Sequence, residues 1–164
     1  MNIFIIGMMG TGKSTIGILL ANKVKKPFID LDEEIEKSTK RTISDIFRID
    51  GENIFRKIET EHLKKVSDSV ISCGGGIILK EENRNLIRRN GTTILLTASI
   101  RELTNRLKYS NKRPLLAQNS PEDSLSELWS KRKDHYSSTA DITIETDGKT
   151  PEIITNEILI NLKS

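Results

Sequence analysis

Three glycines lie close together near the start of the chain, in residues 7–15, GMMGTGKST. Glycine destabilises regular structure, so this cluster predicts a backbone with positive φ or the close approach of another group. An apolar run, Asn2 to Gly7, precedes the cluster, and an amphipathic run, Lys13 to Lys25, follows it. This order of strand, glycine-rich turn and helix favours a parallel α/β fold.

The same alternation continues along the 164 residues. Short, nearly continuous apolar runs predict strands that are buried on both faces. These strands are expected at Asn2 to Gly7, Pro27 to Asp30, Val70 to Cys73, Thr92 to Thr97 and Ile142 to Ile144. Amphipathic runs between them predict helices at Lys13 to Lys25, Leu31 to Lys40, Ile43 to Arg48, Glu52 to Val66, Glu81 to Arg89, Ile100 to Leu107, Pro121 to Ser137 and Pro151 to Leu162.

Two helix starts carry strong capping signals. Ser120 and Thr150 can each cap a helix, and each is followed by a proline and by acidic residues in the first turn. Five strands joined by helices predict a three-layer α/β domain that binds its ligands at the carboxyl ends of the strands. The polar run 108–119 has no periodicity, and a loop of that length in a compact domain is more often functional than idle.

The spacing of Gly7, Gly12, Lys13 and Ser14 matches the P-loop pattern between a strand and a helix. Such a loop directs backbone N–H groups and a helix N-terminus at a polyphosphate, while the lysine contacts the β- and γ-phosphates and the hydroxyl binds Mg²⁺. The chain is therefore expected to bind a nucleoside triphosphate. P-loops serve small-molecule kinases, GTPases and motor ATPases, but the chain has no guanine-binding Asn-Lys-x-Asp signature and little room for coupling elements. A small kinase needs only a triphosphate site, an acceptor site and a lid.

The composition argues against disulfide-linked, nucleic-acid-binding and membrane proteins. The chain has one cysteine, so it cannot form an internal disulfide. The 26 basic and 23 acidic residues alternate along the chain, and the net charge of +3 is not concentrated as nucleic-acid binders require, so no nucleic-acid partner is expected. The N-terminal apolar run reaches Lys13 too soon for a signal peptide or a membrane span, so we expect no membrane partner and a cytoplasmic location.

Two aspartates, Asp30 and Asp32, follow the second predicted strand in the segment FIDLD. If the strand continues through them, both carboxylates point to the same face and can serve a metal ion or an acceptor hydroxyl. The alternative is the start of a helix, where acidic residues interact favourably with the helix dipole. Their position at a strand end, opposite the P-loop, favours a functional role.

Further along, Gly74, Gly75 and Gly76 follow the third predicted strand. Either they form a flexible turn, or they let the backbone approach a substrate directly. Arg56 lies three residues before Glu59 on a predicted helix, which indicates either an exposed ion pair or a pair that holds the arginine in position. Arg113 lies in the polar loop and can neutralise a transferring phosphoryl group.

Taken together and in order, these segments resemble the shikimate kinase family, which belongs to the nucleoside-monophosphate-kinase-like branch of P-loop proteins. The segments are GMMGTGKST, FIDLDEEIE, ISDIFRIDGENIFRKIE, CGGGI, KRPLL and a Lys-Arg pair on the helix before the last strand. The resemblance implies a P-loop kinase fold with a five-stranded parallel sheet in the order 2-3-1-4-5 and helices on both faces. It also implies a single domain, 1–164, with a substrate-binding region near 31–60, a lid near 108–119 and a monomeric state.

The resemblance further implies the residues of the site. Catalysis would involve Lys13, Asp32 and Arg113, and Mg²⁺ would be held by Ser14 and Asp30, directly or through water. ATP would contact Gly10, Thr11, Gly12, Lys13, Ser14, Thr15, Arg106, Arg113 and Pro151. Shikimate would contact Asp32, Phe47, Phe55, Arg56, Gly74, Gly75, Gly76 and Arg132. The sequence does not decide whether Asp32 removes the proton of the acceptor hydroxyl or only orients it.

The implied reaction transfers the γ-phosphoryl group of ATP to the 3-hydroxyl of shikimate. Arginine suits the acceptor because its planar guanidinium pairs with a carboxylate through two hydrogen bonds. Two other functions compete with this one. A kinase for a different hydroxy acid, such as gluconate, would share the P-loop, and a non-catalytic ATP switch would need no acceptor site.

Overall fold

A computed structural model gives the structure of the chain and describes residues 1–108 and 120–163. All strand pairs in the central sheet are parallel, and the order is β2-β3-β1-β4-β5, as the family resemblance implied. The strands are β1 (Asn2–Gly7), β2 (Phe28–Asp30), β3 (Val70–Ser72), β4 (Gly91–Thr97) and β5 (Ile142–Glu145). The predicted fold class is therefore confirmed.

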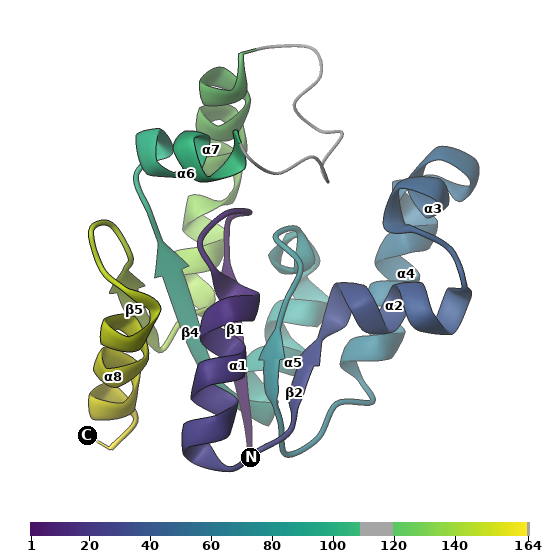
Figure 1. The fold of residues 1–164 in the computed structure, drawn as a ribbon. Helices are drawn as coiled ribbons and strands as arrows, with labels where there is room; N and C mark the ends of the chain where they lie inside the picture. Colours follow the sequence, from purple (N-terminus) through teal and green to yellow (C-terminus); the bar gives the residue numbers. More distant parts are fainter. Residues whose placement is uncertain (109–119, 164) are drawn as a thin grey trace.

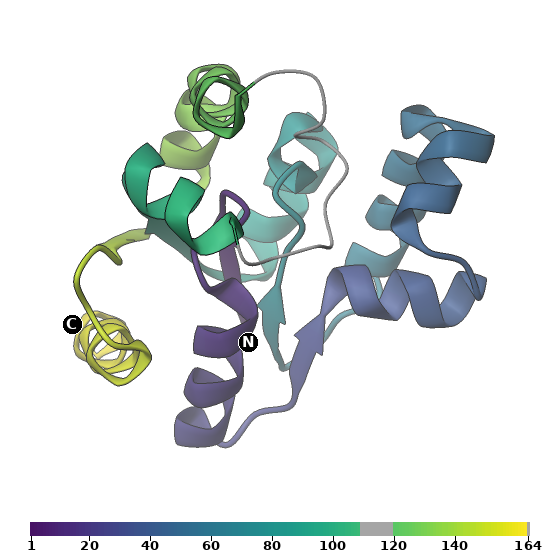
Figure 2. The same cartoon turned by 45° about the horizontal axis from the view of Figure 1, so that its top comes forward.

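Helices connect the strands at nearly the predicted positions (Figure 1). They are α1 (Lys13–Val24), α2 (Leu31–Thr39), α3 (Ile43–Asp50), α4 (Glu52–Leu63), α5 (Glu81–Asn90), α6 (Ile100–Leu107), α7 (Pro121–Thr139) and α8 (Pro151–Leu162). A short 3₁₀ helix, η1 (Ile77–Leu79), follows the triple glycine and was not predicted. Figure 2 shows α2, α3 and α4 together on one side of the molecule and α6 and α7 on the other.

The core lies on both faces of the sheet because successive side chains of a strand point in opposite directions. On β1, Ile3 and Ile5 pack in the cluster that α1 and α8 cover, whereas Phe4 and Ile6 pack in the cluster on the opposite face. All six residues of β1 are buried. The central strand therefore has the continuous apolar sequence of a parallel strand that is covered on both faces.

Two of the strands differ from the prediction of burial on both faces. All residues of β2 are half-buried, and in β5 only Ile144 is buried, between two exposed residues. Both strands form the edges of the sheet. An edge strand has a neighbour on one side only, so the flanking helices cover it less completely than they cover β1 and β3.

Side-chain caps begin most of the helices near the site. Ser120 accepts a hydrogen bond from Asp123 N and Thr150 accepts one from Ile153 N, each with a proline in the first turn, as predicted. Helix α1 has Gly12 as its N-cap, with no side-chain cap and no acidic residue in its first turn. Its first N–H groups are thus left for another acceptor. Within 1–108 and 120–163, no helix has the length and apolar character needed to cross a bilayer.

Candidate active site

The P-loop lies between the end of β1 and the start of α1, as the sequence predicted. Gly7, Gly10 and Gly12 have φ values of 146°, 82° and 88°, a region that side chains rarely adopt. A Cβ on Gly7 would lie 2.4 Å from the carbonyl oxygen of Leu96 on β4, so packing against the neighbouring strand also requires glycine there. The backbone of the loop therefore depends on its glycines.

Lys13 is the first residue of α1 and is only 8% exposed. Its ammonium group donates a hydrogen bond to the carbonyl oxygen of Met8, at 2.9 Å. Ser14 and Thr15, the next two residues, are exposed at the open end of the helix. The loop thus places a cation and a helix N-terminus with no side-chain cap at the carboxyl end of β1, where α/β folds bind ligands.

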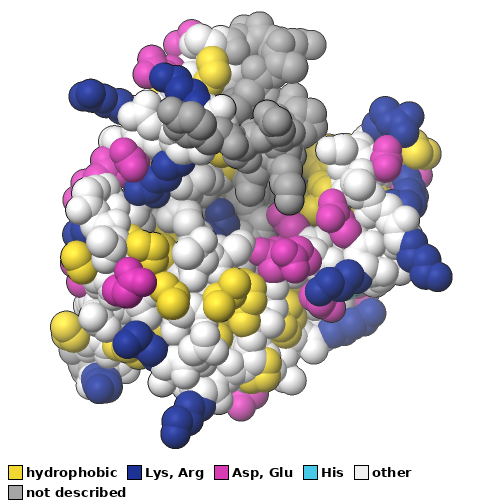
Figure 3. All heavy atoms as spheres, in the orientation of Figure 1, with side chains coloured by type: hydrophobic (Ala, Val, Ile, Leu, Met, Phe, Trp, Pro, Cys, Tyr) yellow, Lys and Arg dark blue, Asp and Glu magenta, His cyan; other side chains and the backbone are white. Residues whose placement is uncertain are grey.

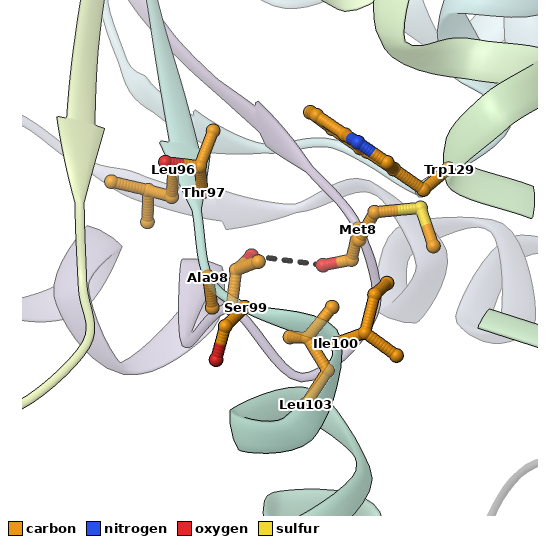
Figure 4. Close-up of a pocket in the computed structure, with 9 residues that line it drawn as sticks. Met8, Leu96, Thr97, Ala98, Ser99, Ile100, Leu103 and Trp129 are labelled. Carbon is orange, nitrogen blue, oxygen red and sulfur yellow. Dashed lines mark hydrogen bonds between the residues drawn. The ribbon is translucent and has the colours of Figure 1, made fainter. Parts of the chain in front are cut away.

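Thr11 has an internal role in this structure. Its hydroxyl donates to the carbonyl oxygen of Met8 at 2.8 Å and is buried. Thr11 also lines a cavity of about 220 Å³, whose other lining residues are labelled in Figure 4. The other lining residues are Met8, Leu96, Thr97, Ala98, Ser99, Ile100, Leu103 and Trp129. The hydroxyl of Thr11 thus has a partner within the loop, and the contact of Thr11 with ATP stays a prediction.

Asp30 lies beside the P-loop serine. Ser14 Oγ donates to Asp30 Oδ2 at 2.6 Å and lies 3.3 Å from the hydroxyl of Ser72 at the end of β3. These oxygen donors fit Mg²⁺, which takes few protein ligands and keeps water and phosphate oxygens. In the described residues no three His, Cys, Asp or Glu side chains gather into a metal cluster.

The second strand ends at Asp30 and a helix begins at Leu31, as the predicted bounds had it, so the condition under which both carboxylates of FIDLD would share one strand face is not met. Strand β2 ends at Asp30, which caps α2 by accepting hydrogen bonds from the backbone N–H groups of Asp32 and Glu33. The alternative, an acidic helix start, is what the structure contains, and Figure 3 shows acidic side chains gathered where α2 begins. A carboxylate at the N-cap ends the strand because it satisfies two free N–H groups of the helix.

Asp32 lies in the first turn of α2 and contacts the turn that follows β3. A Cβ on Gly74 would lie 2.8 Å from Asp32 Oδ1 and 3.2 Å from Glu59 Oε1. The next glycine is close to the P-loop, because a Cβ on Gly75 would lie 3.6 Å from the carbonyl oxygen of Gly7. The structure therefore brings the second aspartate, the triple glycine and the P-loop to one end of the sheet.

None of the three glycines in this turn has positive φ, so the turn does not need glycine for its backbone conformation. At Gly74 and Gly76 it needs glycine for space, whereas a side chain at Gly75 would make ordinary contact. A Cβ on Gly76 would lie 2.1 Å from Arg56 Nη2, and a Cβ on Gly75 would lie 3.4 Å from Arg132 Nη1. Side chains from α2, α4 and α7 thus converge on a turn that has no side chains of its own.

Arg56 belongs to a buried pair, so of the two sequence interpretations the exposed ion pair is wrong. Arg56 is 12% exposed, and it donates to the fully buried carboxylate of Glu59 at 2.9 Å and to Glu52 at 3.2 Å. Burial raises the pKa of Glu59 to about 7, although the guanidinium of Arg56 opposes that shift. Glu59 Oε1 has no hydrogen-bond partner among the described residues.

Two aromatic rings lie under this guanidinium. The centroids of Phe47 and Phe55 are 4.8 Å apart, and Arg56 Cζ lies 5.9 Å and 5.1 Å from them, respectively. Cation–π contacts of this kind favour a fixed position of the arginine. The predicted apolar wall and the predicted arginine are therefore neighbours.

Arg132 lies on α7 and is 8% exposed. Among the residues that the structure describes, no carboxylate lies within ion-pair distance of its guanidinium, in contrast to Arg56. The phenol of Tyr136, one helical turn later, lies beside it. A buried guanidinium without a counter-charge is costly, so this arrangement suits an anionic ligand.

On the opposite side of the P-loop, Arg106 of α6 bridges two loops. It donates to the carbonyl oxygen of Gly10 at 3.1 Å and to the hydroxyl of Thr146 at 3.2 Å. Pro151 begins α8, a few residues after Thr146. Arg113 and the predicted lid, apart from Lys108, lie outside the described residues.

Comparisons with known proteins show the family of this chain. The family model for shikimate kinase matches residues 9–163. The chain is also 44% identical over 161 residues to a shikimate kinase of Persephonella marina, with 96% of each chain covered. The chain belongs to the shikimate kinase family. This is a family of small-molecule kinases, and the predicted family is confirmed.

Solved structures agree with this membership. A shikimate kinase from Acinetobacter baumannii, solved in complex with shikimate, superimposes with a TM-score of 0.94 at 34% identity, covering 99% of this chain and 92% of that one. A gluconokinase from Sinorhizobium meliloti, by contrast, is 18% identical with a TM-score of 0.55, covering 99% and 91% of the two chains. The likeness to the gluconokinase shows a shared fold and nothing more.

Sequence reasoning named Glu59 only as a partner of Arg56, and it missed Ser72 and Tyr136 in this member of the shikimate kinase family. Ser72 ends β3 beside Ser14, and Tyr136 lies beside Arg132. The spacing of Arg132 and Tyr136 offered a signal, because residues four apart share a helix face. Without knowing which face of α7 is buried, that signal could not be distinguished from ordinary amphipathicity.

Proposed function

We propose that the chain transfers the γ-phosphoryl group of ATP to the 3-hydroxyl of shikimate, giving shikimate 3-phosphate and ADP on the route to chorismate and the aromatic amino acids. Membership of the family and the likeness to a relative solved with shikimate support this proposal. The observation that carries it is Arg132, a buried guanidinium with no carboxylate partner among the described residues, beside a side-chain-free turn. An acceptor carboxylate supplies the missing charge.

On the donor side, the backbone N–H groups of the P-loop and the start of α1 hold the phosphates of ATP. The residues proposed for these contacts are Gly10, Thr11, Gly12, Ser14 and Thr15. Lys13 already lies at this point of the loop, and its ammonium can exchange the carbonyl of Met8 for the β- and γ-phosphates. Arg106 and Pro151 border the adenine, and Arg113 is proposed to neutralise the transferring group.

On the acceptor side, Arg56 and Arg132 bind the carboxylate of shikimate. Gly74, Gly75 and Gly76 leave room for the ring and present their backbone to it, and Phe47 and Phe55 form the apolar wall. Asp32 accepts a hydrogen bond from the 3-hydroxyl, which orients that oxygen toward the γ-phosphorus, and its carboxylate is the group placed to take the proton. As the new P–O bond forms, the bond to ADP breaks.

Ser14 and Asp30 are proposed to hold Mg²⁺ at the phosphates, directly or through water. When bound, this ion neutralises charge on the phosphate oxygens. Catalysis of phosphoryl transfer relies mainly on positioning and on neutralising charge, so side chains in fixed positions matter more than a covalent intermediate with the enzyme. Every contact proposed here comes from one chain, so a monomer suffices for the reaction.

A coupled assay of ADP release with shikimate, with gluconate and with no acceptor tests the proposal. Turnover that depends on shikimate is the expected result. A preference for gluconate would refute the acceptor assignment. ATP consumption that is equal in all three conditions would instead support the nucleotide switch, the competing function of a different class.

A further inference from the structure

The inner face of α7 carries Arg132 and Tyr136 four residues apart. Both are buried, and Tyr136 is completely so. Residues with this spacing point to the same side of a helix, one turn apart. The face that brings the guanidinium to the triple-glycine turn therefore brings the phenol there as well.

Each carbonyl of the turn has its own hydrogen-bond donor. The carbonyls of Gly74 and Gly76 accept from the N–H groups of Ile77 and Leu79, both at 3.1 Å. The donor to the carbonyl of Gly75 is instead a side chain from another element, the hydroxyl of Tyr136 on α7, at 2.6 Å. Helix α7 therefore fixes the central peptide of a segment that has the highest intrinsic backbone freedom in the chain.

This bond also fixes the direction of the next N–H group. In a trans peptide the carbonyl of Gly75 and the N–H of Gly76 point in opposite directions. With the carbonyl held toward α7, the N–H of Gly76 points away from α7. Gly76 itself touches Arg56 of α4, and its N–H donates to no group in the described part of the chain.

The phenol also lies next to the arginine. Positions close to a Cβ on Gly75 are occupied by Arg132 Nη1, at 3.4 Å, and by the hydroxyl of Tyr136, at 3.6 Å. Burial raises the pKa of Tyr136 to about 12, against the opposing effect of Arg132, so the hydroxyl remains a donor at neutral pH. The ring is stacked on Trp129 at 6.1 Å between centroids, which limits its movement.

We infer that Tyr136 is a positioning residue for the acceptor: by holding the carbonyl of Gly75 it aims the N–H of Gly76 at the acceptor carboxylate, next to Arg56 and Arg132. This inference rests on the proposed function, since it concerns the same acceptor site. It adds a residue that touches neither substrate but sets the geometry of the groups that do.

Tyr136→Phe tests the inference because it removes the hydroxyl and keeps the ring. The expected result is a rise of about five- to tenfold in the KM for shikimate, with kcat and the KM for ATP within about twofold of the parent protein. Thr139→Val is the matched control. It removes another buried hydroxyl from α7, one that bonds within the helix to the carbonyl of His135, and it should leave the KM for shikimate unchanged.

A second acceptor separates positioning from a structural effect. With the methyl ester of shikimate, which lacks the carboxylate charge, parent and Tyr136→Phe proteins should have KM values within about twofold. An equal rise in KM for the acid and for the ester would overturn the inference. Changes in kcat and in the KM for ATP as large as the rise in the KM for shikimate would overturn it as well. So would an unchanged KM for shikimate in a variant whose circular dichroism shows that it is folded.

The parent protein separates failure of the proposed function from failure of the inference. If it phosphorylates gluconate and not shikimate, the proposed acceptor is wrong, and the same comparison is made with gluconate and its methyl ester. If it uses no acceptor, both proposals fail together. If it uses shikimate and Tyr136→Phe is unaffected, only the positioning role fails.

Discussion

The proposed nucleotide side and the proposed acceptor side of the site are built in different ways. The P-loop, residues 7–15, is one continuous segment between β1 and α1. The acceptor side draws Asp32 from α2, Arg56 from α4, the glycines from the turn after β3, and Arg132 from α7. A local loop tolerates changes elsewhere in the chain, whereas a convergent site depends on the packing of four elements.

Lys13→Ala gives the largest expected effect and acts on the donor side alone. Removing the ammonium should lower kcat by about 10²–10³-fold or more with any acceptor, because the charge on the transferring group loses a fixed partner. Steady-state assays measure this loss. Lys23→Ala, at an exposed position of the same helix, is the control. A similar loss in both variants would mean that α1, not the ammonium, is affected.

Arg132→Ala acts on the acceptor side alone. The variant should lower kcat/KM for shikimate by about 100-fold while the affinity for ATP, measured by calorimetry, stays unchanged. Arg48→Ala removes an arginine that is 72% exposed and should change neither value. If Arg132→Ala weakened ATP binding and spared shikimate, the division into two sides would be wrong.

The variants Gly76→Ala and Gly75→Ala test how much room the turn leaves for a side chain at each of the two positions. The added methyl group would overlap Arg56 at position 76 but make ordinary contact with Arg132 at position 75. The KM for shikimate should therefore rise about tenfold in Gly76→Ala and distinctly less in Gly75→Ala. Equal effects in the two variants would contradict the account of the turn as a space for converging side chains.

Glu59 gives the smallest expected effect, a pH dependence of stability. Its raised pKa means that between pH 4.5 and about 7 the folded protein keeps a proton that the unfolded chain has released. Holding this proton adds to the free energy of unfolding. That contribution is fully present below pH 4.5 and is lost as the pH rises through about 7.

Denaturant unfolding between pH 5 and 7 measures this effect. The free energy of unfolding of the parent relative to Glu59→Gln should fall by about 2 kcal/mol over that range. Glu61→Gln, at an exposed position of the same helix whose pKa is lowered by Lys64, should show no such fall above pH 5. A flat difference for Glu59→Gln would show that Arg56 keeps the carboxylate ionised.

The fold was largely predictable from sequence, since apolar runs, amphipathic periods and the caps at Ser120 and Thr150 are local signals. The boundary inside FIDLD was predicted at Asp30, but the sequence left open whether the two aspartates share a strand face or begin a helix. Asp30 decides between them by capping α2. The burial of Glu59 was also beyond the sequence, because an arginine three residues before a glutamate has the same pattern on a surface and in a core.

What the sequence by itself determined is the donor half: GMMGTGKST sets the backbone of the P-loop, because the glycine conformations, the lysine and the helix start all arise from adjacent residues. Only the tertiary structure decided that Arg56 has carboxylate partners and that Arg132 has none among the described residues. It also decided that Tyr136 reaches the carbonyl of Gly75. The physical reason is that burial and partners depend on groups brought together from distant segments, and these set the energetic cost of a charge.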